Sequence, residues 1–213
     1  MRMTDDRSGW PRGAASAGRR EQIVTATIQM LAAHGYVGAS FDSVVAHAGL
    51  SSKRLITYHF QTKERLYEDV IAQVARTAAD FMTPLIGQHA SRRDRLRAYI
   101  TANIQFISEF PEHVRASQEI VAHLPRVPAA RAMTDDALDR LVAAFVDGQR
   151  AGEFRSFDPL VMAVSLRASI DAAAGRLQHG ADPAPYAQEL ATAFDLATSA
   201  PVADPTSSPT DMA

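Results

Sequence analysis

Along most of the chain, apolar residues recur every three or four positions, the spacing that gives an α-helix one buried face. Phe41, Val44, Val45 and Ala48 show this pattern within one short segment. No segment alternates apolar and polar residues in the way a half-buried strand does. The pattern therefore predicts an all-α protein of about nine helices.

Residues 40–50 predict a short helix that ends in a sharp turn. Ser40 is placed as its N-cap, because a serine hydroxyl accepts a hydrogen bond from the first helical turn. Gly49 lacks a Cβ and can adopt the left-handed conformation that stops a helix. We expect Leu50, the next residue, to fill the angle between this helix and the one that follows.

A second short helix is predicted directly after this turn. Ser51 or Ser52 is placed to cap it, and Ile56 and Phe60, four residues apart, are expected to face the first helix. The opposite face carries cations and a hydroxyl group, which suit the major groove of DNA: Lys53, Arg54 and Thr57. Two short helices joined by a glycine turn are typical of a helix-turn-helix motif.

This stretch resembles the DNA-binding segment of the TetR family of bacterial transcriptional regulators, over about residues 19 to 67. The residues that carry the resemblance are Arg20-Glu21-Gln22-Ile23, Gly35-Tyr36, Ser40-Phe41, Val44-Val45-Ala46, Ala48-Gly49-Leu50-Ser51, Tyr58-His59-Phe60 and Lys63-Glu64. Between Gly49 and Tyr58 the chain is one residue longer than the commonest family pattern, and Thr57 stands where an aromatic residue is usual.

The resemblance implies a cytoplasmic regulator with an N-terminal three-helix DNA-binding domain and a C-terminal helical domain. It also implies the partners: double-stranded DNA with a palindromic operator, a second copy of the chain in a homodimer, and an unknown small-molecule effector that releases the DNA. The protein is then a repressor, and no cofactor, metal or membrane is expected. An architectural or constitutive DNA-binding protein without a small ligand is the main alternative.

The side chains predicted to contact DNA divide by their chemistry. Hydroxyl, imidazole and ammonium groups near helix ends donate to phosphate oxygens, and those expected to do so are Ser40, Tyr58, His59 and Lys63. Base edges are expected to be read by Lys53, Arg54 and Thr57, with Ser51 and Ser52 at the start of the helix. For Tyr58, packing inside the domain is an equal alternative.

Four domain divisions are predicted. Residues 1–17 form a disordered basic arm, 18–65 the DNA-binding domain, 66–199 the ligand-binding and dimerisation domain, and 200–213 a disordered tail. The first helix is expected to run from about Ala17 to His34 and to stop at Gly35. The fourth is expected to start at Thr62 as N-cap and to be limited by Pro84.

In the second half, Thr134 is expected to cap one helix, and Asp158 followed by Pro159 is a strong signal for the start of another. This helix, to about Gln178, is apolar or small nearly all round, and it needs cover on two sides. A last helix is expected from about Pro185 to Thr198. The side chains predicted to form the dimer interface lie on these two helices: Met162, Leu166, Ile170, Ala173, Leu177, Leu190 and Phe194.

An apolar effector pocket with a few polar groups is predicted in the second domain. Its candidate residues are Phe81, Asn103, Phe106, Phe110, His123, Phe145, Met162 and Arg167. Methionine and phenylalanine at helical spacing are more often ordinary core residues. Arg167 needs a partner amid apolar neighbours, and Asp171, one turn further on, is the simplest candidate.

Composition narrows the chemistry. The chain has 213 residues and no cysteine, which excludes disulfides and thiolate metal sites. Its net charge is only −2, but residues 1–70 carry 9 Lys and Arg against 7 Asp and Glu. We find neither an HExxH nor a GxSxG motif and no glycine-rich phosphate loop, so no catalytic residues are expected and a helical-bundle enzyme is the least favoured alternative.

Overall fold

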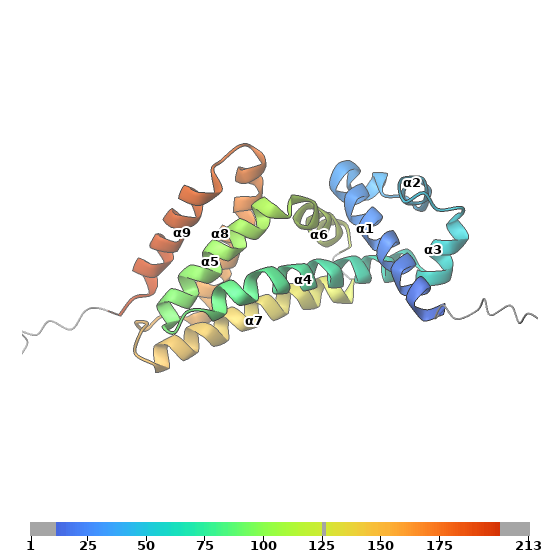
Figure 1. Ribbon diagram of the computed structural model, residues 1–213. Helices are drawn as coiled ribbons and strands as arrows, with labels where there is room; N and C mark the ends of the chain where they lie inside the picture. The colour runs from blue at the N-terminus through green and yellow to red at the C-terminus, as the bar shows by residue number, and fades with distance from the viewer. Residues whose placement is uncertain (1–11, 125–126, 201–213) are drawn as a thin grey trace, which may run out of the picture. The chain divides into compact units, whose positions relative to one another are not determined.

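The computed structural model describes residues 12–124 and 127–200, and in these ranges the chain forms helices joined by short connections and no strand, which confirms the all-α prediction (Figure 1). Residues 1–11 of the predicted arm and 201–213 of the predicted tail lie outside the described residues. The helices in the described ranges are α1 (Arg12–Gly38), α2 (Phe41–His47), α3 (Lys53–Phe60), α4 (Lys63–Gly87), α5 (Arg92–Glu109), α6 (Pro111–His123), α7 (Pro128–Arg150), α8 (Pro159–Gln178) and α9 (Pro183–Thr198).

The chain divides into two compact units. The first contains the residues up to Thr77 together with Phe110–Met133, and the second contains Ala78–Glu109 together with the residues from Thr134 onward. Helix α6 therefore belongs with the N-terminal helices, a grouping that the sequence division at residue 66 does not anticipate. Helix α4 starts in the first unit and ends in the second.

The first unit is built around α1, which packs against α2 and α6. Its core takes apolar side chains from every helix of the unit, because each short amphipathic helix must bury one face. The largest of these side chains that are fully buried are Ile23, Leu31, Ile56, Leu66, Tyr67, Ile71 and Ile120.

Helix α1 begins earlier than expected, at Arg12. The predicted arm to residue 17 was thus too long. Ala14, Ala15 and Ala17 explain the difference, because alanine has the highest helix propensity. Near the other end, Gly35 leaves helical geometry at φ 66° and ψ −176°, as the predicted stop requires, although the helix resumes as far as Gly38.

Two other helix boundaries were predicted wrongly. Helix α4 continues through Pro84 to Gly87, because the proline removes only its own bond to the carbonyl of Asp80, whose residue is exposed to water. Helix α7 begins at Pro128 and not after Thr134. Proline is favoured in the first turn of a helix, where its missing N–H would have no partner.

In the second unit, α5 packs against both α8 and α9 (Figure 1). Asp158 caps α8 by accepting hydrogen bonds from the backbone N–H groups of Leu160 at 2.8 Å and Val161 at 3.1 Å, which confirms the predicted start signal. Asp182 caps α9 in the same way, so α9 begins at Pro183, two residues before the predicted Pro185.

The connector between α7 and α8 is fixed to the end of α9. The N–H of Arg155 donates to the carbonyl of Thr198 at 2.9 Å, and Phe154 and Ser199 form an isolated antiparallel bridge. The ring of Phe154 lies where a Cβ on Gly148 would be, and it also packs near Phe145. Among residues 12–124 and 127–200, no helix has the length and apolar character that crossing a bilayer would need.

Candidate nucleic-acid interface

The turn between α2 and α3 has the geometry that the sequence predicts. Ser40 caps α2, its hydroxyl oxygen accepting a hydrogen bond from the N–H of Ser43 at 3.1 Å. Gly49 has φ 62°, and the N–H of Leu50 donates back to the carbonyl of Val45 at 3.0 Å. Leu50 is buried, as expected for a residue that fills the angle between two helices.

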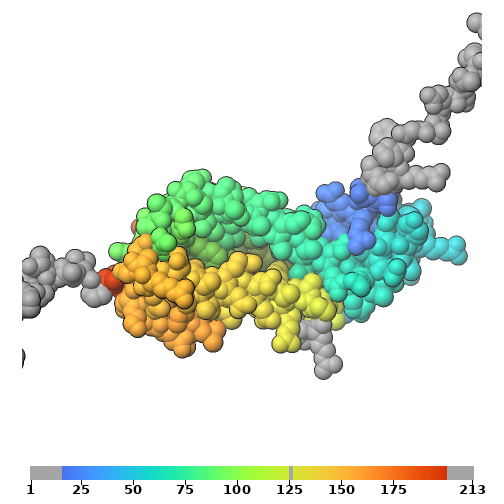
Figure 2. Space-filling model, turned by 90° about the horizontal axis from the view of Figure 1, so that it is seen from below, coloured from blue at the N-terminus to red at the C-terminus, as the bar shows by residue number. Residues whose placement is uncertain are grey.

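Helix α3 separates its two faces as the pattern predicts. Ile56 and Phe60 are 0% and 2% exposed and hold the helix on the core of the first unit. Ser52 stands at the N-cap position, but its hydroxyl makes no capping bond. The opposite face is open to solvent and carries Lys53, Arg54 and Thr57, and Ser51 just before the helix is also exposed. This part of the chain is cyan in Figure 2.

The two cations at the start of α3 differ in their surroundings. The ammonium group of Lys53 pairs with the carboxylate of Asp42 in the first turn of α2. Arg54 has no ion-pair partner within the described part of the chain, so its guanidinium can bind a ligand without first breaking a contact. Asp42 gives no functional signal in the sequence, because an acid in a first helical turn is explained by the helix dipole alone.

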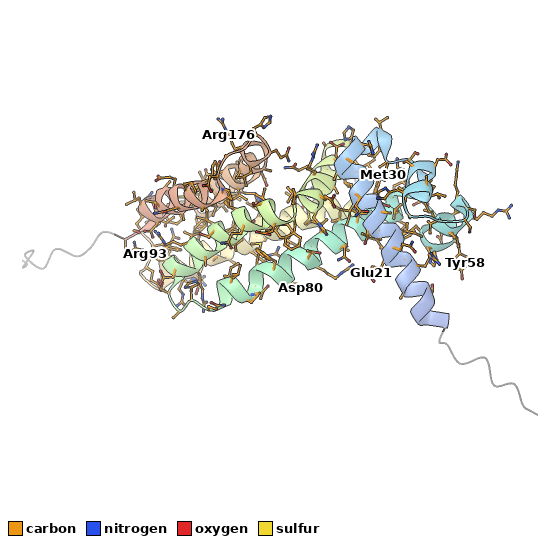
Figure 3. All side chains as sticks on the ribbon, turned by 45° about the horizontal axis from the view of Figure 1, so that its top comes forward. Glu21, Met30, Tyr58, Asp80, Arg93 and Arg176 are labelled. Atoms are coloured by element: carbon orange, nitrogen blue, oxygen red, sulfur yellow. The ribbon has the colours of Figure 1, made fainter. Side chains whose placement is uncertain are left out.

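Tyr58 projects from α3 into solvent, with 78% of its surface exposed (Figure 3). The alternative in which this ring packs inside the domain is therefore wrong. Its ring meets the ring of His59 edge to face, at 5.1 Å between centroids, and His59 is half-buried. An exposed phenol and a neighbouring imidazole can both donate to phosphate oxygens.

The link from α3 to α4 is strained. Gln61 has φ 62°, the only positive φ outside glycine in the described ranges, and the N–H of Thr62 donates to the carbonyl of Phe60 at 2.6 Å across it. This is the rare form of the γ-turn. Thr62 then caps α4 as predicted, its hydroxyl accepting from the N–H of Arg65 at 3.2 Å.

Lys63 lies against aromatic rings at the start of α4. Its Nζ is 4.5 Å from the ring centroid of Tyr36 and 5.3 Å from that of Tyr67, within the range of cation–π attraction. Burial lowers the pKa of Lys63. Tyr36 in turn stacks on His123 of α6 at 4.9 Å, and its backbone N–H donates to Glu119 at 2.8 Å.

The hydroxyl of Tyr67 is buried and has no hydrogen-bond partner among the residues that the structure describes. Burial also raises the pKa of this phenol, so it stays neutral. The ammonium group of Lys63 contacts the Tyr36 ring and the neutral Tyr67 ring. No carboxylate forms an ion pair with it in the described structure. Lys63 is thus a cation held in place by rings, available to a phosphate.

The residues predicted for an effector pocket fall in both units. In the second unit, Phe81 and Phe106 lie 6.1 Å apart between ring centroids, and Phe145 is fully buried. Phe110 and His123 belong to the first unit. There Phe110 meets His113 edge to face at 5.7 Å, and burial lowers the pKa of His113.

The polar candidates for that pocket already have partners. Asn103 is 8% exposed and donates to the backbone carbonyl of Tyr99 at 2.8 Å. Arg167 pairs with Asp171 at 2.6 Å, which is the simpler arrangement considered from the sequence. Met162 is half-buried on α8.

The predicted dimerisation residues occupy mostly the inward face of their helices. Leu166, Ile170 and Ala173 are 0% exposed within the single chain, while Met162, Leu177, Leu190 and Phe194 are half-buried. The exposed apolar side chains of this pair of helices are others, and sequence reasoning missed them: Leu160, Val161 and Val164 of α8 and Leu196 of α9, at 53%, 63%, 49% and 75% exposure. Helical periodicity finds a buried face without telling which neighbour covers it.

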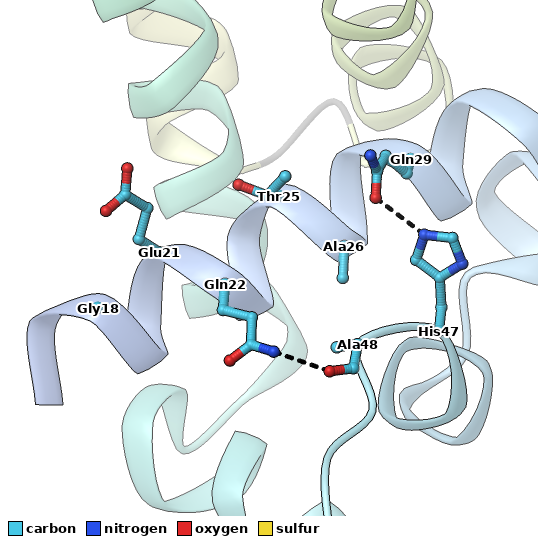
Figure 4. Close-up of a pocket in the computed structure, with 8 residues that line it drawn as sticks. All are labelled: Gly18, Glu21, Gln22, Thr25, Ala26, Gln29, His47 and Ala48. Atoms are coloured by element: carbon cyan, nitrogen blue, oxygen red, sulfur yellow. Dashed lines mark hydrogen bonds between the residues drawn. The ribbon is translucent and has the colours of Figure 1, made fainter. Parts of the chain in front are cut away.

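Two open hollows lie away from the predicted pocket residues. One, of about 440 Å³, lies in the first unit between α1 and α2 and is lined by Glu21, Gln22, Gln29 and His47 among others (Figure 4). The other lies in the second unit beside Arg93, Arg97 and Asp195. Hydrogen bonds from Arg93 lower the pKa of Asp195, so this carboxylate is ionised and forms ion pairs with both arginines.

The comparisons with known proteins agree with this geometry. Residues 23–70 match the sequence profile of the tetR family of bacterial regulatory proteins. Among curated proteins, none matches the chain. A solved Rhodococcus sp. protein assigned to the TetR-family transcriptional regulators is 28% identical, with a TM-score of 0.72 over 86% of this chain and 100% of that one.

Two more distant structures share the fold. One is a Saccharomonospora viridis protein assigned as a transcriptional regulator and solved with choline, which is 20% identical with a TM-score of 0.73 over 87% of this chain and 100% of that one. The other is AibR in complex with isovaleryl coenzyme A and operator DNA, which is also 20% identical, with a TM-score of 0.70 over 82% of this chain and 97% of that one. The resemblance is thereby confirmed: residues 23–70 belong to the tetR family of bacterial regulatory proteins, and the chain has the all-helical fold of TetR-family transcriptional regulators.

Proposed function

We propose that this TetR-family regulator is a repressor that binds a palindromic operator as a homodimer and releases it when a small-molecule effector binds. The observation that carries the proposal is the division of α3, with Ile56 and Phe60 buried and Lys53, Arg54 and Thr57 exposed directly after the glycine turn. An exposed short helix with cations and a hydroxyl at its start can enter the major groove. With DNA as partner, the protein works in the cytoplasm.

The division of labour at this surface follows from side-chain chemistry. Arg54 can donate two hydrogen bonds to O6 and N7 of guanine, and the methyl group of Thr57 can contact thymine. Ser40, Tyr58, His59 and Lys63 supply donors for phosphate oxygens. Lys53 must first leave Asp42, so we assign it a smaller part in base reading than Arg54.

A homodimer is proposed because one short helix reads too few base pairs to select a site in a genome. The exposed face of α8 supports this, because Leu160, Val161 and Val164 are followed on the same side by the small exposed residues Ala168 and Ala172. Small residues allow a second helix to approach closely. Leu196 of α9 adds the most exposed apolar side chain of this unit.

An effector is proposed because similar folds hold small molecules, choline in one structure and isovaleryl coenzyme A in another. The neighbouring rings Phe81 and Phe106 in the second unit are the best candidates for an apolar wall. The predicted residues Asn103, Phe145, Met162 and Arg167, which belong to the same unit, stay proposals for this site.

Gel retardation on the DNA upstream of the chain's own gene tests the proposal. We expect a specific complex that weakens steeply as salt rises, because cations replace counterions on the phosphates. Choline and isovaleryl coenzyme A are the first effector probes. A helical-bundle enzyme would give no specific complex, and a constitutive regulator would keep its complex with every ligand of a wider panel.

A further inference from the structure

Two side chains of α1 are bonded to the backbone on either side of α3, one at its C-terminal end and one at the turn that precedes it. At the C-terminal end, Arg20 uses Nη1 to donate to the carbonyl of His59 at 2.8 Å. Its Nε donates to Asp69 of α4 at 2.5 Å, and its guanidinium carbon lies 4.6 Å from the ring centroid of Phe60. One arginine thus joins α1, α3 and α4.

The bond to His59 satisfies a group that the helix leaves unpaired. The last four carbonyls of an α-helix have no donor inside the helix. The carbonyl of Thr57 accepts from Gln61 at 2.9 Å and that of Phe60 from Thr62 at 2.6 Å, and Arg20 supplies the donor for His59. A cation is also favoured at this negative end of the helix dipole.

At the other end, Gln22 is bonded to the turn that precedes α3. Its Nε2 donates to the carbonyl of Ala48 at 2.8 Å, directly before Gly49 (Figure 4). Arg19 donates to the side-chain oxygen of Gln22 at 2.7 Å and so fixes the orientation of the amide. Beside it, the His47 ring is hydrogen-bonded to Gln29 at 2.8 Å, which also joins α1 to α2.

Helix α3 needs such bonds because it is short. It has eight residues, and its buried face has only two fully buried side chains, Ile56 and Phe60. A helix of this length is not stable by itself, and its orientation depends on its neighbours. A rotation about Ile56 and Phe60 would move the guanidinium of Arg54 away from a base edge. The bond at the C-terminal end of α3 and the bond to the turn before it oppose that rotation.

We propose that Arg20 and Gln22 are positioning residues for DNA recognition: without touching DNA, they set the orientation in which α3 presents Arg54 and Thr57. The proposal rests on the DNA-binding function proposed above. In the sequence, both residues are notable only because they belong to the motif that resembles the TetR family. The positioning role is inferred from their hydrogen bonds in the structure.

The test compares the full-length variants Arg20→Lys and Gln22→Met with the control Arg65→Lys. Lysine keeps the charge of Arg20, but its ammonium group cannot reproduce the two hydrogen bonds that the planar guanidinium donates to Asp69 and His59. Methionine keeps the size of Gln22 without a hydrogen-bond donor. Arg65 pairs with Glu68 on the surface of α4, so its lysine variant reports any general effect of such a change. The DNA probe is a duplex selected by the wild-type protein from a random pool.

We expect both variants to lose at least about tenfold in affinity for the selected duplex, the worth of one base contact. Affinity for unselected DNA and the salt slope should stay at the control value, because the phosphate contacts remain. Without DNA, amide hydrogen exchange over residues 49–60 should be faster in both variants than in the control. A loss of thermal stability alone, with an unchanged ratio of specific to non-specific binding, would contradict the proposal.

The exchange measurement separates this inference from the proposed function. If the wild-type protein selects no duplex, the proposed function is wrong. The positioning role in DNA recognition is then wrong too, whatever the exchange data show. If the wild type selects a duplex and both variants bind and exchange like the control, only the positioning role is wrong. If the Arg20→Lys variant does not fold, the Gln22→Met variant alone tests the positioning role. Its substitution changes no charge, so a change in its DNA affinity cannot come from altered electrostatic attraction.

Discussion

Helix α3 of the first unit and helix α8 of the second both carry residues predicted from the sequence to contact a partner. The two sets of residues differ in their exposure to solvent. On α3 the predicted residues Lys53, Arg54 and Thr57 are all exposed. On α8 three of the predicted residues, Leu166, Ile170 and Ala173, are buried inside their own chain. Polar residues on an amphipathic helix identify its free face, whereas apolar residues on a nearly all-apolar helix identify no particular neighbour.

The largest expected effect tests the buried face of α8. Leu166→Ala should lower the free energy of unfolding by about 2 to 5 kcal/mol, because it removes a fully buried side chain and leaves a cavity. Val161→Ala, on the exposed face of the same helix, is the control and should change it by less than about 0.5 kcal/mol at protein concentrations where the chain is monomeric. Chemical denaturation measures both, and equal effects would mean that the two faces are assigned wrongly.

The exposed face of α8 is tested by Val161→Glu. If this face is the dimer interface, a buried carboxylate should raise the dimer dissociation constant at least about a hundredfold, which is nearly 3 kcal/mol. The helix itself should tolerate the change, since a glutamate is favoured near a helix N-terminus. Sedimentation equilibrium gives the constant. A variant that dimerises like the wild type would exclude this face.

On α3, Arg54→Ala and Lys63→Ala should have different consequences. Arg54→Ala should remove about 1 to 3 kcal/mol of preference at one base position of each half-site. Lys63→Ala should weaken binding to all DNA alike and reduce the salt slope by about one. Titrations of matched and mismatched duplexes at several salt concentrations measure both. If the two changes act equally on every duplex, our separation of base and phosphate contacts is wrong.

The sequence predicted the first unit in more detail than the second for a physical reason. Ser40, Gly49 and Thr62 act through local backbone geometry, which depends on residues close in sequence. The ion pair of Lys53 with Asp42 and the bonds of Arg20 to His59 and Asp69 join separate helices. Such pairings follow from the packing of the fold, so a single sequence does not reveal them.

A smaller effect is expected at the strained link after α3. Gln61→Gly should stabilise the first unit by about 0.5 to 1 kcal/mol, because glycine adopts the positive φ of 62° without steric strain. Gln88→Gly, at an exposed position with no positive φ, is the control and should not stabilise the protein. Thermal unfolding measures the difference. A destabilised Gln61→Gly variant would show that the side chain of Gln61 contributes more than the strain costs.

The smallest expected effect is a pH dependence of stability in the first unit. Burial lowers the pKa of His113, so the unfolded chain binds the proton more readily than the folded one. This contribution to stability is present above the usual histidine pKa of about 6.5 and is lost as the pH falls through the lower folded value. His113→Gln should therefore flatten the decline in unfolding free energy below that pH, while the exposed control His89→Gln should not.

The most direct test of the account is the selection of DNA from a random pool by the full-length protein, followed by sequencing. We predict an inverted repeat whose half-site centres are about one helical turn, or a multiple of it, apart. Repeating the selection with Arg54→Ala should erase the preference at one symmetry-related position in each half. An asymmetric single site, no enriched sequence, or a preference that Arg54→Ala leaves intact would contradict the assignment of α3 as the element that reads DNA.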